Sequence, residues 1–136
     1  MKEYVLDANA LVRLFRNAPG ADSVEELVKH AKSGRAHLII SVVNLTEVLY
    51  ILARYFGQEE ALRYVDKSRR VVEPIAVDEQ IAIDTAILRI RYKLGLADCF
   101  AAELAIRMGA TLVTADPEFS KLGKQLKVLA LPRHEQ

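Results

Sequence analysis

The first ten residues, MKEYVLDANA (residues 1–10), place a short apolar run directly before an acid. Residues Glu3 to Leu6 predict a buried strand, and an apolar, helix-like stretch begins just after Asp7. A carboxylate at the end of a buried strand is costly unless it has a partner or a task there. In parallel sheets, ligands bind beyond the carboxyl ends of the strands, so Asp7 stands where function is expected.

Apolar runs alternate with amphipathic stretches along the rest of the chain. We predict strands at Glu3–Leu6, Ala36–Ile40, Val71–Ile75, Ala110–Thr114 and Lys127–Leu129. We predict helices at Ser23–Ser33, Ser41–Phe56, Gln58–Lys67, Asp78–Leu94 and Ala97–Met108. Their end signals are the capping box Ser23–Glu26, the N-caps Ser41 and Asp78, and the closing residues Gly34, Gly57, Gly95 and Gly109.

Strands separated by helices need crossover connections, which indicates a parallel sheet covered on both faces. The fold class predicted is therefore α/β, a three-layer α/β/α sandwich with a mainly parallel five-stranded sheet. Pro74 suggests that the third strand lies at an edge of the sheet or ends there. We expect one domain over residues 1–132, followed by a short tail, 133–136.

The composition excludes several classes of protein. No apolar run approaches the roughly 18 residues of a membrane span, and the start lacks a signal-peptide core, so we expect a cytoplasmic protein without a membrane partner. The single cysteine, Cys99, excludes an internal disulfide framework. The net charge is only +1, with basic clusters at Lys67–Arg70 and Arg89–Lys93. Each cluster is either solvated surface or a rim that contacts phosphates.

Two acids follow the ends of predicted buried strands. Asp7 follows the first strand, and Asp116 follows the fourth. Because the carboxyl ends of parallel strands meet at one edge of a sheet, we expect both side chains there. Each is also a good helix N-cap or turn residue, an alternative that is strongest for Asp116, which precedes Pro117.

Two further acids lie on predicted helices. Glu47 belongs to a helix that is apolar nearly all round, so we expect the helix to be buried. An ionised carboxylate in such a helix needs a basic partner, water or a metal. Asp98 lies in the first turn of another helix, on the same face as Ala101, Ala102 and Ala105, whose small side chains permit close packing on the sheet. The alternatives are a salt bridge for Glu47 and a favourable helix-dipole interaction for Asp98.

Four carboxylates in one cleft repel one another unless they are protonated, paired with basic groups or bound to divalent cations. An oxygen-rich acidic site suits Mg²⁺ or Mn²⁺, and such ions promote phosphodiester hydrolysis. Two uncharged polar residues, Asn9 and Thr114, are candidates to orient a carboxylate or a metal-bound water. The alternatives are that Asn9 caps the first helix and that Thr114 only ends a strand.

Taken together, these residues resemble the PIN domain, the nuclease fold of VapC-like toxins, over nearly the whole chain. The segments that carry the resemblance are Val5–Asn9, Ser41–Val48, Leu96–Ala105 and Gly109–Phe119. The last segment, a T-x-D-x-x-F pattern after a strand, is the most specific, whereas a lone D-x-N is weak. The chain departs from the family at Ala8, where a Thr or Ser is common, which removes a hydroxyl but no carboxylate.

The resemblance implies a catalytic site formed by Asp7, Glu47, Asp98 and Asp116. It implies that the three aspartates hold the metal, that Asn9 and Thr114 line the site, and that the protein is an Mg²⁺- or Mn²⁺-dependent endoribonuclease acting on RNA. Toxins of this family usually dimerise and are silenced by an antitoxin that occludes the cleft. We therefore expect the toxin of a toxin–antitoxin pair, a homodimer with an antitoxin partner.

Other interpretations stay open. One is an RNA-processing or quality-control PIN nuclease without an antitoxin, and another is an inactive PIN-like module that binds RNA or a protein. An aspartyl-nucleophile phosphatase is weaker, because Asn9 stands where that chemistry needs a second Asp. Candidates for a dimer face are Tyr50, Tyr55, Phe56, Leu88 and Tyr92, which are at least as well suited to the core.

Overall fold

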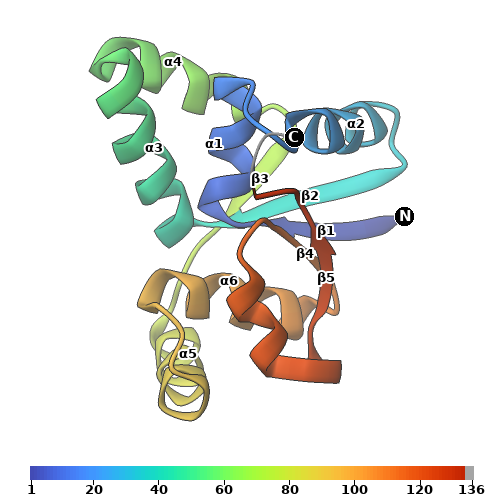
Figure 1. Ribbon diagram of the computed structural model, residues 1–136, viewed down its shortest axis with the longest axis vertical. Helices are drawn as coiled ribbons and strands as arrows, with labels where there is room; N and C mark the ends of the chain where they lie inside the picture. The colour runs from blue at the N-terminus through green and yellow to red at the C-terminus, as the bar shows by residue number, and fades with distance from the viewer. Residues whose placement is uncertain (134–136) are drawn as a thin grey trace.

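The computed structural model describes residues 1–133 and places a five-stranded sheet between two groups of helices (Figure 1). The strands are β1 Lys2–Leu6, β2 Ala36–Ser41, β3 Val72–Ile75, β4 Thr111–Thr114 and β5 Lys127–Ala130. They lie in the order β3-β2-β1-β4-β5, and every neighbouring pair is parallel. The predicted three-layer α/β/α sandwich is confirmed, and the sheet is parallel throughout rather than mainly parallel. As Pro74 suggested, β3 is an edge strand.

The helices are α1 Ala8–Arg16, α2 Ala21–Lys32, α3 Val42–Phe56, α4 Gln58–Ser68, α5 Glu79–Tyr92 and α6 Leu96–Met108, with a 3₁₀ segment, η1, at Pro117–Gln125. Helices α1 to α4 cover one face of the sheet, and α5, α6 and η1 cover the other (Figure 1). Alternate strand residues supply the two cores: Leu6 and Ile40 pack toward α1–α4, whereas Val5 and Ile39 pack toward α6 and η1.

Most predicted helix ends are observed. Ser41 and Asp78 cap α3 and α5 through their side chains, which accept from the amides of Val43 and Ile81 at 3.2 and 2.9 Å. Gly109, with φ of 62°, ends α6.

Two local predictions are wrong, and one segment was missed. Helix α2 begins at Ala21, because Gly20, with φ of 90°, turns the chain straight into the helix and leaves Ser23 inside it. Helix α5 ends at Tyr92, where Lys93 adopts φ of 52°, and Gly95 instead precedes α6. Segment η1 was not predicted at all.

The strand order reverses at the neighbouring strands β1 and β4: the chain first builds β2 and β3 on one side of β1, and then β4 and β5 on the other. From β1 the chain crosses to β2 through α1 and α2 on one face, and from β3 it crosses to β4 through α5 and α6 on the other. The carboxyl ends of β1 and β4 therefore flank a topological switch point, the usual place for a ligand in such sheets. Of the predicted tail, 133–136, all but Arg133 lies outside the described residues. Within residues 1–133, no helix is long and apolar enough to cross a membrane.

Candidate active site

Asp7 connects β1 to α1 and is buried, with 4% of its surface exposed. Its Oδ1 accepts from the amide of Ala10 at 2.8 Å, which makes Asp7 the N-cap of α1. Its Oδ2 accepts from the hydroxyl of Thr114 at 2.5 Å. The predicted Asn9 cap is therefore wrong: the chain is still extended at Asp7, and Asn9 is already in the first helical turn. Asn9 is exposed, and its Oδ1 accepts from Nε of Arg13.

Thr114 links two of the acids. Its buried hydroxyl donates to Asp7 and accepts from the backbone amide of Asp116 at 3.0 Å. Asp116 in turn caps η1, since its Oδ1 accepts from the amide of Glu118 at 2.9 Å. Thr114 thus ends β4 and also fixes the positions of Asp7 and Asp116, so its two predicted roles are compatible.

The two acids on helices approach the same edge from different elements. Asp98 lies half-buried in the first turn of α6, and the predicted packing of Ala101, Ala102 and Ala105 is confirmed because all three are buried. Glu47 is half-buried on α3, at the boundary between the packed and exposed sides of the helix. The prediction that α3 is buried all round is wrong, because the helix is covered on one side only.

Sequence reasoning missed Asn44, one helical turn before Glu47. Asn44 is 1% exposed, and its Nδ2 donates to Oε1 of Glu47 at 3.3 Å and to the carbonyl of Ala97 at 3.1 Å. It therefore fixes Glu47 and joins α3 to the first turn of α6, next to Asp98. Its Oδ1 is buried without a hydrogen-bond partner among the described residues. A polar amide within an otherwise apolar helix segment was the available signal.

The electrostatics show that the four acids influence one another. Burial raises the pKa of Asp7 from 3.8 to about 6, opposed by the hydrogen bonds from Thr114 and Ala10 and reinforced by repulsion from Asp116 and Glu47. Burial also raises the pKa of Asp98 to about 6, with repulsion from Asp116, Asp7 and Glu47 as the next causes. The structure therefore brings the four predicted acids to one edge of the sheet.

No basic side chain of the described residues forms an ion pair with this cluster. Within residues 1–133, every ion pair involves a carboxylate other than these four. The described residues also contain no preformed metal site, that is, no group of three or more Asp, Glu, His or Cys side chains arranged to hold an ion. Mg²⁺ takes only one or two protein carboxylates and keeps several waters, so an open set of oxygens suits it. The donor chemistry therefore fits a hard divalent cation, supplied from outside the chain.

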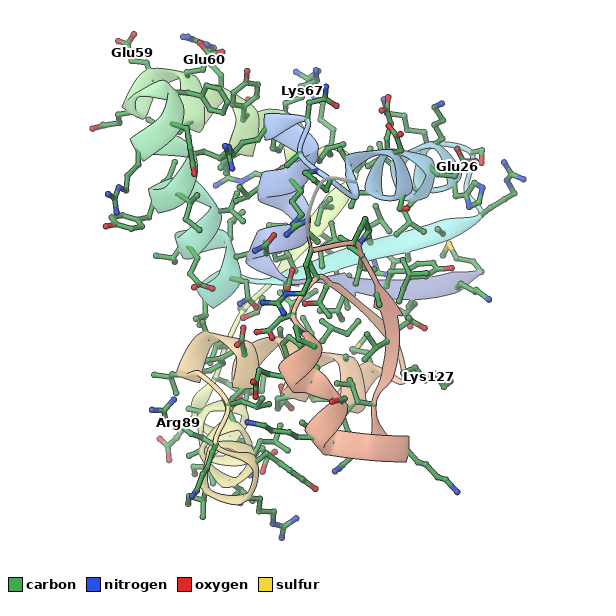
Figure 2. The ribbon with its side chains drawn as sticks, in the orientation of Figure 1. Glu26, Glu59, Glu60, Lys67, Arg89 and Lys127 are labelled. Atoms are coloured by element: carbon green, nitrogen blue, oxygen red, sulfur yellow. The ribbon has the colours of Figure 1, made fainter. Side chains whose placement is uncertain are left out.

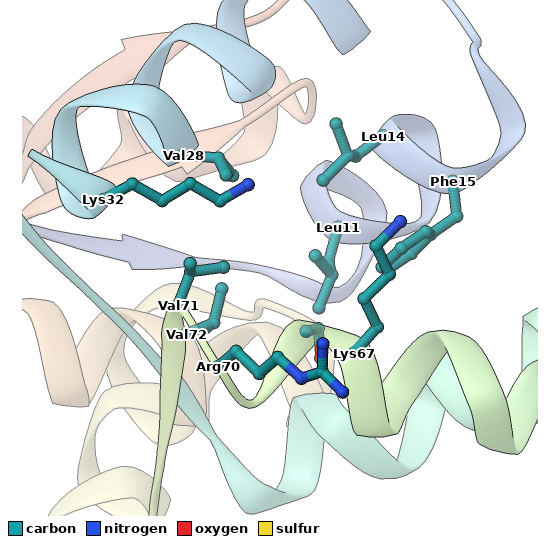
Figure 3. Close-up of a pocket in the computed structure, with 10 residues that line it drawn as sticks. Leu11, Leu14, Phe15, Val28, Lys32, Lys67, Arg70, Val71 and Val72 are labelled. Carbon is teal, nitrogen blue, oxygen red and sulfur yellow. The ribbon is translucent and has the colours of Figure 1, made fainter.

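The two basic clusters lie apart, and one is far from the acids. Lys67 and Arg89 lie on opposite sides of the sheet (Figure 2). The cluster Lys67–Arg70 precedes β3, at the amino end of the strands, and contributes to a separate apolar pocket (Figure 3). Its predicted role as a rim of the acidic site is wrong, because the topology places it at the opposite end of the sheet. Arg89, whose Nη1 donates to the carbonyl of Leu94 at 3.0 Å, stays near the start of α6.

The model of the PIN domain family matches residues 4–125 of the chain. The protein belongs to the PIN domain family. A comparison with curated protein sequences finds no significant match. Solved structures share the fold. VapBC2 from Rickettsia felis, bound to a DNA fragment from its promoter, matches with a TM-score of 0.74 and 22% identity over 95% of this chain and 98% of the other.

Two further structures extend the comparison of this PIN domain. DNA-bound VapBC from Salmonella typhimurium matches with a TM-score of 0.74 and 22% identity, over 96% of this chain and 98% of the other. VapC20 from Mycobacterium tuberculosis, described as a toxin that cleaves the sarcin–ricin loop, matches with a TM-score of 0.65 and 16% identity, over 88% and 95%. At these identities, the likeness establishes the fold.

Proposed function

We propose that this PIN domain is a metal-dependent endoribonuclease that hydrolyses RNA phosphodiester bonds in the cytoplasm, as the toxin of a toxin–antitoxin pair. The observation that carries the proposal is the group of four carboxylates at the switch point, two with a pKa raised to about 6 and none with a basic partner in residues 1–133. The likeness to VapBC complexes and to a sarcin–ricin loop cleaving toxin supports the choice of substrate and system.

The four acids have two different roles in this proposal, metal binding and proton transfer. Asp7, Asp98 and Asp116 hold Mg²⁺ or Mn²⁺, with Asp7 and Asp116 oriented by Thr114. When bound, the ion supplies positive charge that promotes ionisation of water and stabilises the phosphate oxygens of the transition state. Glu47 is the fourth catalytic acid and accepts the proton of the attacking water.

Two polar residues support these acids. Asn44 orients Glu47 through its 3.3 Å hydrogen bond. Asn9 lines the approach to the site from the first turn of α1, where Arg13 holds its side-chain oxygen. Their contribution is to position the reacting groups.

An apolar pocket far from the acids suits the antitoxin. Its volume is about 150 Å³, the size of an apolar cavity that accepts a benzene-sized group, and it lies between α1, α2 and the start of β3. Lys32, Lys67 and Arg70 place three positive charges around it (Figure 3). This combination suits a partner segment with an apolar side chain flanked by acids. Lys67→Glu should weaken binding of the proposed antitoxin, whereas Lys127→Glu, on β5, should not.

A second copy of the chain suits the exposed side of α5. Ile83, Ile87 and Ile90 recur at i, i+4 and i+7 and are 48%, 41% and 79% exposed. A hollow of about 340 Å³ lies beside Ile87, so the isoleucine ridge of one copy can fill the hollow of the other about a twofold axis. The predicted candidates Leu88 and Tyr92 pack partly against α6 instead. Ile90→Glu should shift the sedimentation of a dimer to that of a monomer.

Cleavage of a mixed RNA pool tests the proposed reaction. The wild type should cut RNA in Mg²⁺ or Mn²⁺, lose activity with EDTA, and lose more than about 100-fold on Asp98→Asn, which keeps the size of the side chain and removes one metal ligand. Glu59→Gln is the matched control, because it removes one charge at the exposed start of α4, away from the site (Figure 2). Folded wild-type protein that neither cuts RNA nor binds either metal would contradict the proposal.

A further inference from the structure

Two tyrosines and two arginines gather on the outer ends of α1 and α3. Tyr50 and Tyr55 are 62% and 56% exposed. The guanidinium of Arg54 lies 5.7 Å from the ring centre of Tyr50, and its Nη1 donates to the Tyr50 hydroxyl at 3.3 Å. The guanidinium of Arg16 lies 3.6 Å from the ring centre of Tyr55. We call these four residues the tyrosine–arginine surface.

This surface continues from the acidic site. Glu47, Tyr50 and Arg54 are spaced i, i+3 and i+7, so they lie on one side of α3. At 1.5 Å per residue, Tyr50 is about 4.5 Å and Arg54 about 10.5 Å farther along the helix axis than Glu47. Helix α1, which begins beside Asp7 and ends at Arg16, packs next to α3 (Figure 1). Both helices thus run from the acids to the tyrosine–arginine surface.

The surface is hollowed and carries two positive charges. A groove of about 410 Å³ lies between Tyr50, Ile51, Arg54 and Tyr55. Within residues 1–133, neither Arg16 nor Arg54 forms an ion pair with a carboxylate. Arg16 lies over the ring of Tyr55, and Arg54 donates one N–H to the Tyr50 hydroxyl, so most of their N–H groups remain free for an anion.

Exposed aromatic rings beside unpaired guanidinium groups match the chemistry of unpaired nucleotides. Bases stack on tyrosine rings and on guanidinium planes, while the guanidinium N–H groups hold phosphates. A base within a duplex is already stacked and paired, so its face is not accessible to a side chain. Side chains of this kind favour single strands over duplexes and do not select a particular base.

We propose that the tyrosine–arginine surface binds the single-stranded RNA next to the phosphodiester that is cut. Tyr50 and Tyr55 stack on unpaired bases, and Arg54 and Arg16 hold the backbone phosphates. The inference rests on the proposed nuclease function, and it names the part of the substrate that the acidic site leaves unbound. The four residues position the substrate and take no part in the chemistry.

Binding to a labelled single-stranded RNA of about 12 nucleotides, a length within the usual footprint of single-strand grooves, tests the inference. All variants carry Asp98→Asn so that the RNA stays intact. Tyr50→Leu and Arg54→Gln should each weaken binding by about 5- to 100-fold, the range expected for one stacking or cation contact. Arg54→Gln should also reduce the slope of log affinity against log salt by about 0.7.

Matched variants identify the cause of any loss. Tyr50→Phe keeps the ring and should keep the affinity, whereas Tyr50→Leu keeps only the apolar bulk. Arg63→Gln removes a charge from α4, where Arg63 pairs with Glu60, and should leave RNA binding unchanged. A fully paired RNA of the same length should compete poorly. Because these side chains are exposed, all variants should keep the unfolding midpoint of Asp98→Asn alone.

The outcomes separate this inference from the proposed function. If the wild type cuts RNA but Tyr50→Leu and Arg54→Gln bind it normally, the surface is not the RNA site, although the nuclease stands. If both variants lose RNA affinity while the wild type cuts nothing, the RNA surface stands and the nuclease proposal fails. Unchanged RNA affinity together with a shift from dimer to monomer in sedimentation would make the surface a protein interface and overturn the inference. Equal affinity for paired RNA would overturn it as well.

Discussion

Two groups of charged side chains lie at opposite ends of the sheet and are built differently. At the amino end, His37 on β2 lies between Glu3 on β1 and Glu73 on β3, with nitrogen–oxygen distances of 3.0 and 2.8 Å. At the carboxyl end, four acids share one edge without a basic partner among the described residues. The first group contains its own cation when His37 is protonated, whereas the second does not.

The two groups also differ in how the protein environment affects their charged forms. Hydrogen bonds to Glu73 and Glu3 raise the pKa of His37 and so favour its charged form. At the other end, burial raises the pKa of Asp7 to about 6 and so disfavours the charged form. Exposed ion pairs contribute little to stability, whereas buried acids without partners reduce it. Proteins retain such destabilising groups mainly where function needs them, which is why we assign binding to the carboxyl end.

The largest expected effect is on the pH dependence of stability without metal. The folded pKa of Asp7 is about 6 and its unfolded value is 3.8, so between these values the folded state holds the proton more strongly. The contribution of Asp7 is therefore present below about pH 4 and lost as pH rises through 6, by up to about 3 kcal/mol. Denaturant unfolding with EDTA at several pH values measures it.

The control for this prediction is Asp7→Asn, which keeps a capping side chain but does not titrate. Other carboxylates impose their own pH dependence on both proteins, so the quantity to compare is the difference between them. Relative to Asp7→Asn, the wild type should lose stability from pH 4 to pH 6. A difference that does not change over this range would show that Asp7 is ionised throughout, and the contrast between the two ends of the sheet would fail.

A smaller effect is expected when the link between two acids is removed. Thr114→Val deletes the hydroxyl that donates to Asp7 and accepts from the Asp116 amide. The free energy of unfolding should fall by about 1–3 kcal/mol, because a buried donor loses its acceptor. RNA cleavage should fall about 10- to 100-fold, because Asp7 and Asp116 lose their common support. Thr114→Ser keeps the hydroxyl and should retain both stability and RNA cleavage. If Thr114→Val changed neither, the acids would need no such support.

The smallest effect is expected at the amino end. His37→Gln should change the free energy of unfolding by less than about 1 kcal/mol, since the three side chains are partly exposed. Because the folded pKa of His37 is raised above 6.5, its contribution is present below pH 6.5 and is lost as pH rises through the folded value. The effect should therefore be larger at pH 6 than at pH 8, with RNA cleavage unchanged. A loss of RNA cleavage in His37→Gln would show that the amino end of the sheet affects the acidic site, contrary to the separation of the two ends.

The sequence predicted the elements that depend on local pattern. Nearly continuous apolar runs predicted the buried parallel strands, and Ser41 and Asp78 predicted helix starts that the structure shows. Asp7 and Asp116 were predicted together because strand ends in a parallel sheet converge, a property of topology that the alternation of strands and helices already implies. That Glu47 and Asp98 form one site with them was implied by the resemblance to the PIN domain. Their catalytic roles stay a prediction.

What depends on tertiary contacts could not be predicted. The place of Lys67–Arg70 is an exception: the cluster directly precedes the strand predicted at Val71–Ile75, so a parallel sheet already implied a position at the amino end, opposite the acids. Asn44 and Thr114 have neutral side chains whose partners are set only when α3 meets α6 and β4 meets β1. The exposure of Tyr50 follows from α3 being covered on one side only, which its apolar composition concealed.

Thermal unfolding at pH 7 with increasing Mn²⁺, for the wild type and Asp98→Asn, shows whether the four acids bind a divalent cation. Mn²⁺ should stabilise the wild type in a saturable way, by about 2.7 kcal/mol at a concentration 100 times the dissociation constant, and should stabilise Asp98→Asn far less. Without metal, Asp98→Asn should unfold at a higher temperature than the wild type, because one repelling charge is gone. Equal responses of the two proteins to Mn²⁺, or no response of the wild type, would contradict the claim that the four acids form a cation site.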